Sequence, residues 1–206
     1  EGTLEDIQIN GLKHLTDSYV RSRLDLATTT PLNRNSLETA LQLLILNPIV
    51  ATVSAELTAG SQAGSNILLI EIAEADPFAL ILSINNHRPS SIGEIQGSVS
   101  ANHLNLFGFG DRFNAQYNFT EGLDLSSFSY FLPLNSYETT LGFSYDRSDS
   151  KIIESEFRDL DIESETETIS VSLQQPLLRS PNRELNLGFN LDIRRRRSFL
   201  QDDPFA

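Results

Sequence analysis

From residue 78 onward, apolar and polar residues alternate in one stretch after another. A period of two is typical of β-strands whose two faces meet different surroundings. The alternation predicts seven long strands, at residues 78–84, 95–101, 113–119, 128–132, 137–145, 168–173 and 185–193. This part of the chain therefore has to form an antiparallel sheet with one apolar and one polar face.

Two architectures satisfy such alternation. In a soluble sandwich the apolar face is a core, whereas in a membrane barrel it meets lipid and the polar face lines the lumen. The predicted strands are longer than is usual in soluble sheets. Their polar faces carry mostly small uncharged residues, and aromatic residues such as Phe78, Phe119 and Tyr145 lie near strand ends, as in interfacial girdles. These features favour the barrel, with the sandwich as the alternative.

Two helices are predicted in the first 76 residues. Thr16 is a residue type that often caps a helix, and a short helix follows over 19–24. A second helix opens at Asn35 and ends before Pro48, because the residue preceding a proline avoids the helical region. At helical spacing, the apolar face of this second helix consists of Leu37, Ala40, Leu41, Leu44 and Ile45.

Three strands complete this first region, over residues 4–9, 49–58 and 67–73. The order strand, helix, helix, strand, strand predicts a small α+β sheet with both helices on one face. At Asp76 and Pro77 the pattern changes to the barrel-type alternation with hardly any linker. We therefore expect two domains, residues 1–76 and 77–206.

Charge and composition exclude several functions. The 15 Lys and Arg residues against 28 Asp and Glu give a net charge of −13, which disfavours nucleic-acid binding. The absence of Cys excludes disulfides, thiolate catalysis and Cys-ligated zinc, and the three His lack metal-ligand spacing. No apolar run reaches the roughly 18 residues of a membrane helix. Without a nucleophile–base grouping or a phosphate-binding lysine motif, we expect no enzyme, no nucleotide and no cofactor.

Three further segments allow both a structural and a functional interpretation. Gly108 and Gly110 predict a tight turn with positive φ, with a phosphate-binding loop as the alternative. The acidic segment 149–167 predicts an exposed, mobile extracellular loop, with weak cation binding as the alternative. The four arginines at 194–197 predict a charged strand end at the outer surface, with a nucleic-acid or lipopolysaccharide patch as the alternative.

Several motifs resemble those of two-partner secretion transporters of the outer membrane, the haemolysin activation and secretion family. The stretch 47–72, which begins with Asn-Pro-Ile-Val and contains Gly60 and Gly64, is similar to the second half of the family's barrel-proximal POTRA domain. Residues 77–86 resemble the first barrel strand. Leu-Asn-Leu-Phe-Gly-Phe-Gly-Asp at 104–111 resembles the family's Asn-Pro-Leu-Gly-Leu-Gly-Asp turn, with Leu-Phe in place of Pro-Leu.

The resemblance implies a larger parent protein. Members of the family have a closed barrel with more strands, further POTRA sequence, a plug helix and an Arg-Gly-Tyr/Phe motif that is absent here. We therefore expect an internal fragment, with residues 1–76 in the periplasm and 77–206 forming the first part of an outer-membrane barrel. The connections at 87–93, 120–124 and 146–167 then face the cell exterior.

By resemblance, the protein secretes a large β-rich exoprotein of the adhesin or haemolysin type, captured unfolded by the POTRA domain. Its partners are then this cargo and outer-membrane lipid. A barrel-protein insertase of the same superfamily and a soluble two-domain binding module are the alternatives. In the POTRA fold the strand 49–58 lies at a sheet edge, where it can pair with an extended chain. The implied capture residues are Ile49, Val50, Ala51, Thr52, Val53 and Ser54 of this strand, with Leu41 and Leu44 of the second helix.

Overall fold

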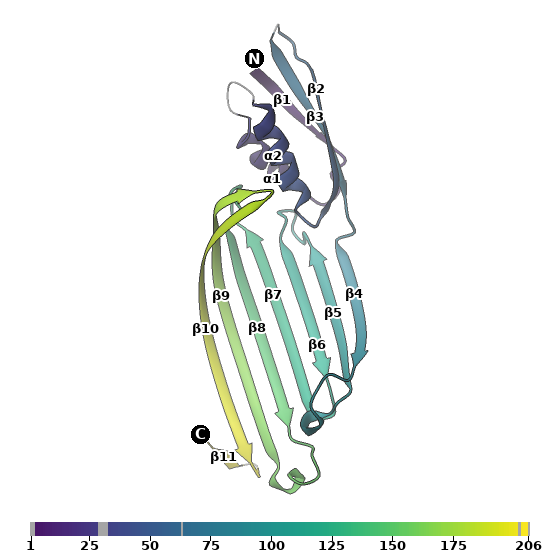
Figure 1. The fold of residues 1–206 in the computed structure, drawn as a ribbon, viewed down its shortest axis with the longest axis vertical. Helices are drawn as coiled ribbons and strands as arrows, with labels where there is room; N and C mark the ends of the chain where they lie inside the picture. Colours follow the sequence, from purple (N-terminus) through teal and green to yellow (C-terminus); the bar gives the residue numbers. More distant parts are fainter. Residues whose placement is uncertain (1–2, 29–32, 63, 202, 206) are drawn as a thin grey trace.

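The computed structural model describes residues 3–28, 33–62, 64–201 and 203–205, whose strands form two sheets (Figure 1). The N-terminal elements are, in chain order, β1 (Thr3–Asn10), α1 (Asp17–Asp25), α2 (Arg34–Ile45), β2 (Val50–Ala59) and β3 (Ser65–Glu74). The predicted order strand, helix, helix, strand, strand is confirmed. None of the described helices is long and apolar enough to cross a membrane.

The N-terminal region, which we define as the described part of residues 3–76, has a packed core between its sheet and its helices. The sheet order is β1-β3-β2, with β1 parallel and β2 antiparallel to the central β3. Both helices cover one face of this sheet (Figure 1). The fully buried apolar side chains of the core are Val20, Leu24, Ile49, Leu68 and Ile70.

The helix boundaries differ slightly from the prediction. α2 begins at Arg34, before the predicted Asn35, because the Asn33 side chain accepts a hydrogen bond from the backbone N–H of Asn35 (2.9 Å) and so caps the helix. Of the predicted apolar face, the side chains of Leu37, Ala40 and Leu44 are buried, whereas Ile45 is 46% exposed. The face that packs on the sheet is therefore narrower than the helical spacing indicates.

The second sheet, which we call the large sheet, contains all strands after residue 77. They are β4 (Phe78–Asn85), β5 (Gln96–Leu104), β6 (Arg112–Phe119), β7 (Leu123–Pro133), β8 (Thr140–Lys151), β9 (Ile162–Ser180), β10 (Arg183–Leu200) and β11 (Asp203–Phe205). Each strand pairs antiparallel with its sequence neighbour, in the order β11-β10-β9-β8-β7-β6-β5-β4. These strands form one curved layer (Figure 1), which differs from the two facing sheets of the sandwich alternative.

The strand register of the large sheet separates apolar from polar side chains. Paired positions across four strands form an apolar row of Tyr130, Phe143, Val171 and Leu191. The adjacent row points to the opposite face and consists of Ser129, Ser144, Ser170 and Asp192. Leu82 and Phe189 on the apolar face are 70% and 67% exposed. An uncovered apolar face of this extent has to be covered by other material, and in a membrane barrel that material is lipid.

At the end remote from the N-terminal region, the strands run further than predicted. β8 continues to Lys151 and β9 begins at Ile162. The prediction of a loop over 149–167 is therefore wrong in its bounds, and the connection covers only 152–161. Beyond the apolar residues, these strands pair charged side chains, for example Arg147 opposite Glu167. Alternation of hydrophobicity does not detect such a strand extension.

At the opposite end, which is the end near the N-terminal region, β9 continues through Pro176 to Ser180. A β-bulge lies at this proline, and β8 pairs with β9 no further than Gln174, so the missing N–H of the proline breaks no ladder on that side. The strand predicted from Tyr137 begins at Thr140 instead. β11, which alternation did not predict, adds an eighth strand.

The connections β4–β5, β6–β7 and β8–β9 lie at the end of the large sheet remote from the N-terminal region (Figure 1) and are hydrogen-bonded to one another. The N–H of Gly122 donates to the carbonyl of Ile92, and the N–H of Ile153 donates to the carbonyl of Ser91, both at 2.9 Å. Short 3-10 turns over Ser90–Ile92 and Arg158–Leu160 shape two of these connections. The three connections therefore form one packed unit.

Candidate functional site

The predicted capture strand lies at an edge of the N-terminal sheet. β2 pairs with β3 alone, and in the described structure the backbone of residues 52–59 makes no hydrogen bond other than those to β3. Ala51, Thr52 and Ser54 are exposed there, and Val53 is half-buried. This edge carries free N–H and C=O groups that can accept a further strand.

The other predicted capture residues are less accessible. Ile49, Val50 and Leu44 are at most 4% exposed and belong to the core, and Leu41 is partly buried against it. A β-bulge between Val50 and Thr52 shifts the alternation so that both Val50 and Val53 pack toward the core, while Ile49 is buried just before the strand begins. The side chains of Ile49 and Val50 cannot line an exposed groove, so the accessible part of the predicted site is 51–54.

The opposite edge of the same sheet, β1, is partly occupied. The Arg21 Nη2 atom donates to the carbonyl of Ile7 at 2.8 Å, while Arg21 also contacts Asp17 at 3.0 Å and Asp6 at 3.7 Å. A side chain that already satisfies an edge carbonyl blocks strand addition at that point. The two edges therefore differ, and β2 is the more accessible one.

The polar face of the large sheet is the candidate wall of a conduit. Its neutral side chains bond to one another: Asn114 donates to Ser129 at 3.2 Å, and Gln96 donates to Asn118 at 3.2 Å. Gln96 and Asn118 are less than a tenth exposed, because the β4–β5 connection reaches this face and Arg88 bonds to Gln96. A wall of short neutral groups offers a passing polypeptide few strong contacts.

The β5–β6 turn, residues 105–111, fixes the large sheet to the start of α1. Asp111 is fully buried, and its carboxylate accepts hydrogen bonds from the backbone N–H groups of Leu106 (3.1 Å) and Phe107 (3.0 Å). Gly108 has a φ of 91°, and its carbonyl accepts bonds from both the N–H and the hydroxyl of Thr16 at 3.0 Å. The turn with positive φ predicted at Gly108 and Gly110 is confirmed.

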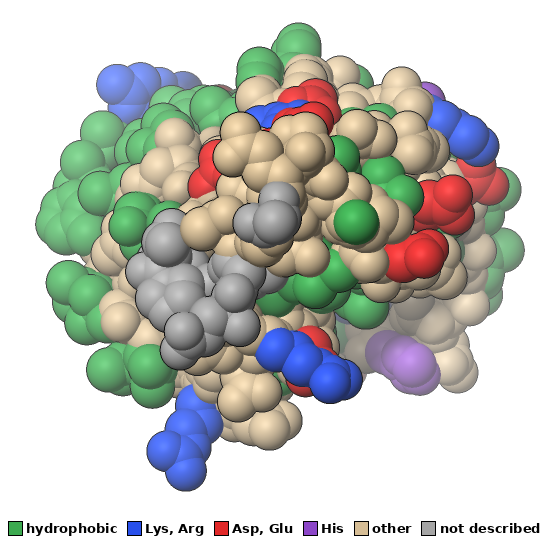
Figure 2. Space-filling model, turned by 90° about the horizontal axis from the view of Figure 1, so that it is seen from above, with side chains coloured by type: hydrophobic (Ala, Val, Ile, Leu, Met, Phe, Trp, Pro, Cys, Tyr) green, Lys and Arg blue, Asp and Glu red, His purple; other side chains and the backbone are tan. Residues whose placement is uncertain are grey.

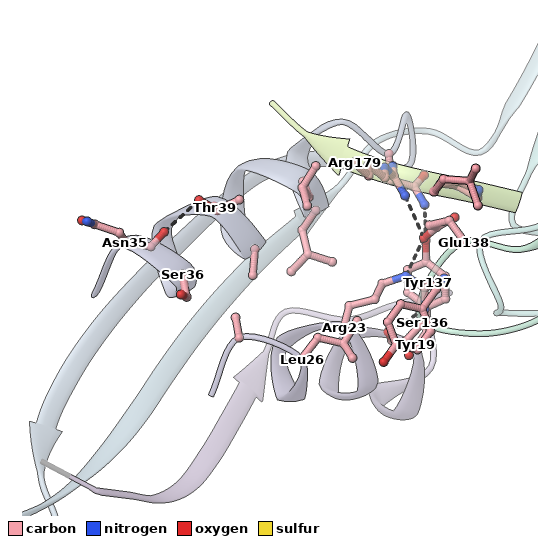
Figure 3. Close-up of a pocket in the computed structure, with 17 residues that line it drawn as sticks. Tyr19, Arg23, Leu26, Asn35, Ser36, Thr39, Ser136, Tyr137, Glu138 and Arg179 are labelled. Atoms are coloured by element: carbon pink, nitrogen blue, oxygen red, sulfur yellow. Dashed lines mark hydrogen bonds and ion pairs between the residues drawn. The ribbon is translucent and has the colours of Figure 1, made fainter. Parts of the chain in front are cut away.

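A partly buried charge cluster joins α1 to the β7–β8 turn and to the end of β9 (Figure 3). Arg23 Nε donates to Glu138 Oε1 at 2.6 Å, and Arg179 Nη1 lies 3.6 Å from the same oxygen. The Arg23 guanidinium also lies 3.4 Å from the centre of the Tyr19 ring. Burial raises the pKa of Tyr19, and the nearby charge of Glu138 raises it further.

The same cluster borders a cavity of about 480 Å³ between the two helices, the β7–β8 turn and the end of β9 (Figure 3). Apolar side chains contribute much of its lining, among them Leu26, Leu43 and Leu177. Sequence reasoning missed this junction, because Arg23 and Glu138 lie far apart in the chain and neither belongs to a motif. Of the contacts between the N-terminal region and the large sheet, only the glycine-rich turn at 105–111 was recognisable in the sequence.

Glu74 fastens the end of β3 to the segment before α1. Its side chain is 1% exposed and accepts hydrogen bonds from the backbone N–H groups of Lys13 (2.8 Å), His14 (2.9 Å) and Leu15 (3.0 Å). Burial opposes ionisation, but these N–H donors outweigh it and hold the pKa of Glu74 below its usual 4.5. The residue is therefore a charged structural clamp.

The described residues contain no group of three or more His, Asp or Glu placed to hold a metal ion. Seen from the end that carries the N-terminal region, basic and acidic side chains are interspersed among polar ones, and hydrophobic side chains gather toward the rim (Figure 2). The described residues therefore combine an unpaired sheet edge at β2, a sheet face of short neutral side chains, and a set of contacts that join the N-terminal region to the large sheet.

Comparison with known proteins identifies a family and related folds. The sequence model of the haemolysin secretion/activation protein family ShlB/FhaC/HecB matches residues 64–205. Among solved structures, the chain resembles CdiB from Acinetobacter baumannii, with 19% identity and a TM-score of 0.74 over 99% of this chain and 39% of that one. CdiB from Escherichia coli gives 19% identity and a TM-score of 0.74, covering 100% of this chain and 39% of that one.

A third solved structure, BamA from Haemophilus ducreyi lacking POTRA domains 1-3, has 14% identity and a TM-score of 0.71, covering 97% of this chain and 42% of that one. At these identities the likeness concerns the fold. The chain spans about two-fifths of the length of these solved chains. Among curated proteins, none matches the sequence.

Proposed function

We propose, on the premise that this chain belongs to the haemolysin secretion/activation protein family ShlB/FhaC/HecB, that it is the part of an outer-membrane transporter that captures a secreted protein and forms one side of its conduit. Membership of the family confirms the predicted outer-membrane localisation. It excludes the soluble binding module that the sequence also allowed. The family consists of secretion proteins and is not a family of enzymes.

In this proposal, residues 1–76 are a periplasmic POTRA domain and 77–206 the first part of the barrel. Support for the first assignment comes from the order β1-α1-α2-β2-β3, with both helices on one face of the sheet. Support for the second comes from the apolar face of the large sheet, which is uncovered in the described chain. The sheet of the described residues is open, because its edge strands β4 and β11 do not pair with each other.

The free edge of β2 is the observation that carries the secretion proposal. An unfolded exoprotein offers extended backbone, and pairing through main-chain hydrogen bonds is nearly independent of sequence. Residues 52–59 make such pairing possible, whereas Arg21 occupies part of the edge of β1. The expected cargo is a large β-rich protein of the adhesin or haemolysin type, which folds after it reaches the outside.

Proline substitution in the full-length protein tests the capture edge. Alternate N–H groups of β2 point away from β3, so one of the variants Thr52→Pro and Val53→Pro removes a free donor and the other removes a ladder donor. Hydrogen exchange at the core amides of Leu24 and Leu68 shows which of the two variants is still folded. The folded variant is the informative one. We expect it to reduce secretion of the exoprotein several-fold.

Thr52→Val is the matched control, because it removes the hydroxyl, keeps the N–H and favours strand conformation. It should secrete at the wild-type level. Wild-type secretion by the folded proline variant contradicts capture at β2.

Insertion of other barrel proteins is a second candidate, favoured by the fold likeness to BamA over 97% of the chain. The two functions predict different phenotypes. Loss of an insertase lowers the amounts of many outer-membrane barrels, whereas loss of a secretion transporter abolishes export of one exoprotein. We expect deletion of the gene to leave the other barrels at wild-type levels, as quantified by mass spectrometry of isolated outer membranes.

A further inference from the structure

The four consecutive arginines of β10 are divided between the two faces of the large sheet. Arg194 and Arg196 pair with Thr168 and Thr166 of β9, positions on the polar face. Arg195 and Arg197 pair with Glu167 and Glu165, positions on the same face as the apolar residues. The run is therefore two separate pairs, of which one points toward the conduit side and the other toward the membrane side.

The second pair lies where the apolar surface ends. On β10 the outward apolar residues run from Leu185 to Ile193, about 27 Å along the strand at roughly 3.4 Å per residue. With a barrel tilt of about 40°, this corresponds to roughly 20 Å of membrane thickness, close to the ~25 Å apolar band of such barrels. Arg195 is the next outward residue, so it lies at headgroup level, and Arg197 lies one row further out.

The neighbouring outward cations are already paired. Arg147 contacts Asp149 at 2.8 Å and Glu167 at 3.8 Å, and Lys151 contacts Glu163 at 2.9 Å. Arg195 and Arg197 are exposed, and neither has an ion-pair partner within 4.0 Å among the described residues. Exposed guanidinium groups at headgroup depth are suited to phosphate, which they can hold with two parallel N–H donors.

We propose that Arg195 and Arg197 bind the phosphate groups of lipid A, the phosphorylated glycolipid of the outer leaflet. The end of β10 that carries them lies opposite the N-terminal region, so it faces the outer leaflet if that region is periplasmic (Figure 1). The proposal thus rests on the proposed topology. Such binding anchors β9 and β10, the longest strands of the large sheet, to the outer leaflet beyond the hydrophobic band.

The matched pairs of arginines provide the experiment. Full-length protein is purified in detergent, and binding of lipid A is measured by native mass spectrometry for the wild type, for R195Q/R197Q and for R194Q/R196Q. Both variants lose the same charge from the same strand. We expect R195Q/R197Q to weaken lipid A binding by about tenfold, as for the loss of hydrogen bonds to a charged group, and R194Q/R196Q to match the wild type.

Further measurements separate the possible causes of failure. Heat-modifiable migration in gels verifies that each variant is a folded barrel. Dephosphorylated lipid A should bind the wild type weakly, with the same affinity that intact lipid A shows for R195Q/R197Q. Phosphatidylglycerol should compete poorly with lipid A for the wild type. Equal binding by the two variants, or a preference for phosphatidylglycerol, overturns the proposal. Proteolysis of intact cells at 152–161 tests the topology itself, independently of any lipid.

Discussion

The two sheets of this chain use similar strands in opposite ways. Leu68 in the N-terminal sheet is fully buried beneath the helices, whereas Leu82 in the large sheet is 70% exposed. Both residues belong to apolar strand faces, but one face is covered by the chain itself and the other is left for the membrane. The comparison teaches that strand pattern specifies a face, while the neighbouring elements decide what covers that face.

The largest difference is expected from truncating one leucine in each sheet. Leu68→Ala should lower the free energy of unfolding of the N-terminal region by about 2–5 kcal/mol, because it creates a cavity in a closed core. Hydrogen exchange of the α1 and β3 amides in the full-length protein measures this loss. Leu82→Ala should leave those amides unchanged, and an equal effect of both variants would remove the distinction between the two sheets.

A charge on each face of the large sheet should give the next largest effect. Leu141→Arg places a charge on the apolar face and should cost at most about 2–4 kcal/mol, the range for an arginine at the bilayer centre. Ser144→Arg places the same charge on the polar face and should be tolerated better. The readout is the fraction of full-length protein that migrates as a folded barrel. Similar yields of the two variants would contradict the assignment of the faces.

Acidification should affect the N-terminal region through Glu74. Because its folded pKa lies below 4.5, the carboxylate stabilises the fold fully above the unfolded pKa, and this contribution is lost as pH falls through the folded pKa. Glu74→Gln should cost about 1–3 kcal/mol at neutral pH and flatten the acid dependence. Exchange of the α1 amides measured between pH 7 and pH 3 checks both effects. An unchanged pH profile in Glu74→Gln would assign acid sensitivity to other groups.

The smallest expected effect concerns the junction between the two sheets. Glu138→Gln weakens the contacts to Arg23 and Arg179, at a cost of about 1 kcal/mol because the side chains are partly buried. Spin labels on α1 and on the β9–β10 turn should then show a broader distance distribution. Arg34→Gln, at the exposed pair with Glu38, is the control that should leave the distances unchanged.

Periodicity and turn chemistry predicted most of the fold. The order of the N-terminal elements, seven strands of the large sheet and the positive φ of Gly108 follow from local rules that the sequence displays. The extension of β8 to Lys151 and of β9 back to Ile162 did not, because charged side chains outside an apolar band have no hydrophobic alternation. Strand length beyond the membrane is set by hydrogen-bonded pairing and cross-strand charge.

The candidate site was predicted in part. The edge position of residues 51–54 followed from the family resemblance, and the strand order agrees with it. Burial of Val50 could not be predicted, because a β-bulge depends on how β2 meets β3. The junction of Arg23 with Glu138 was equally hidden, since contacts between distant segments arise from packing and leave no local pattern in a single sequence.

The short connection between the two sheets has a mechanical consequence. Only residues 75–77 separate β3 from β4, and their ends are tied down: the N–H of Ala75 donates to Ile49 at 2.8 Å, and the carbonyl of Pro77 accepts from Leu104 at 2.7 Å. Such a connection is too short and too well hydrogen-bonded to act as a flexible linker between the two sheets. Any reorientation of β3 is therefore passed directly to β4, which is the first strand of the large sheet and one of its edges among the described residues.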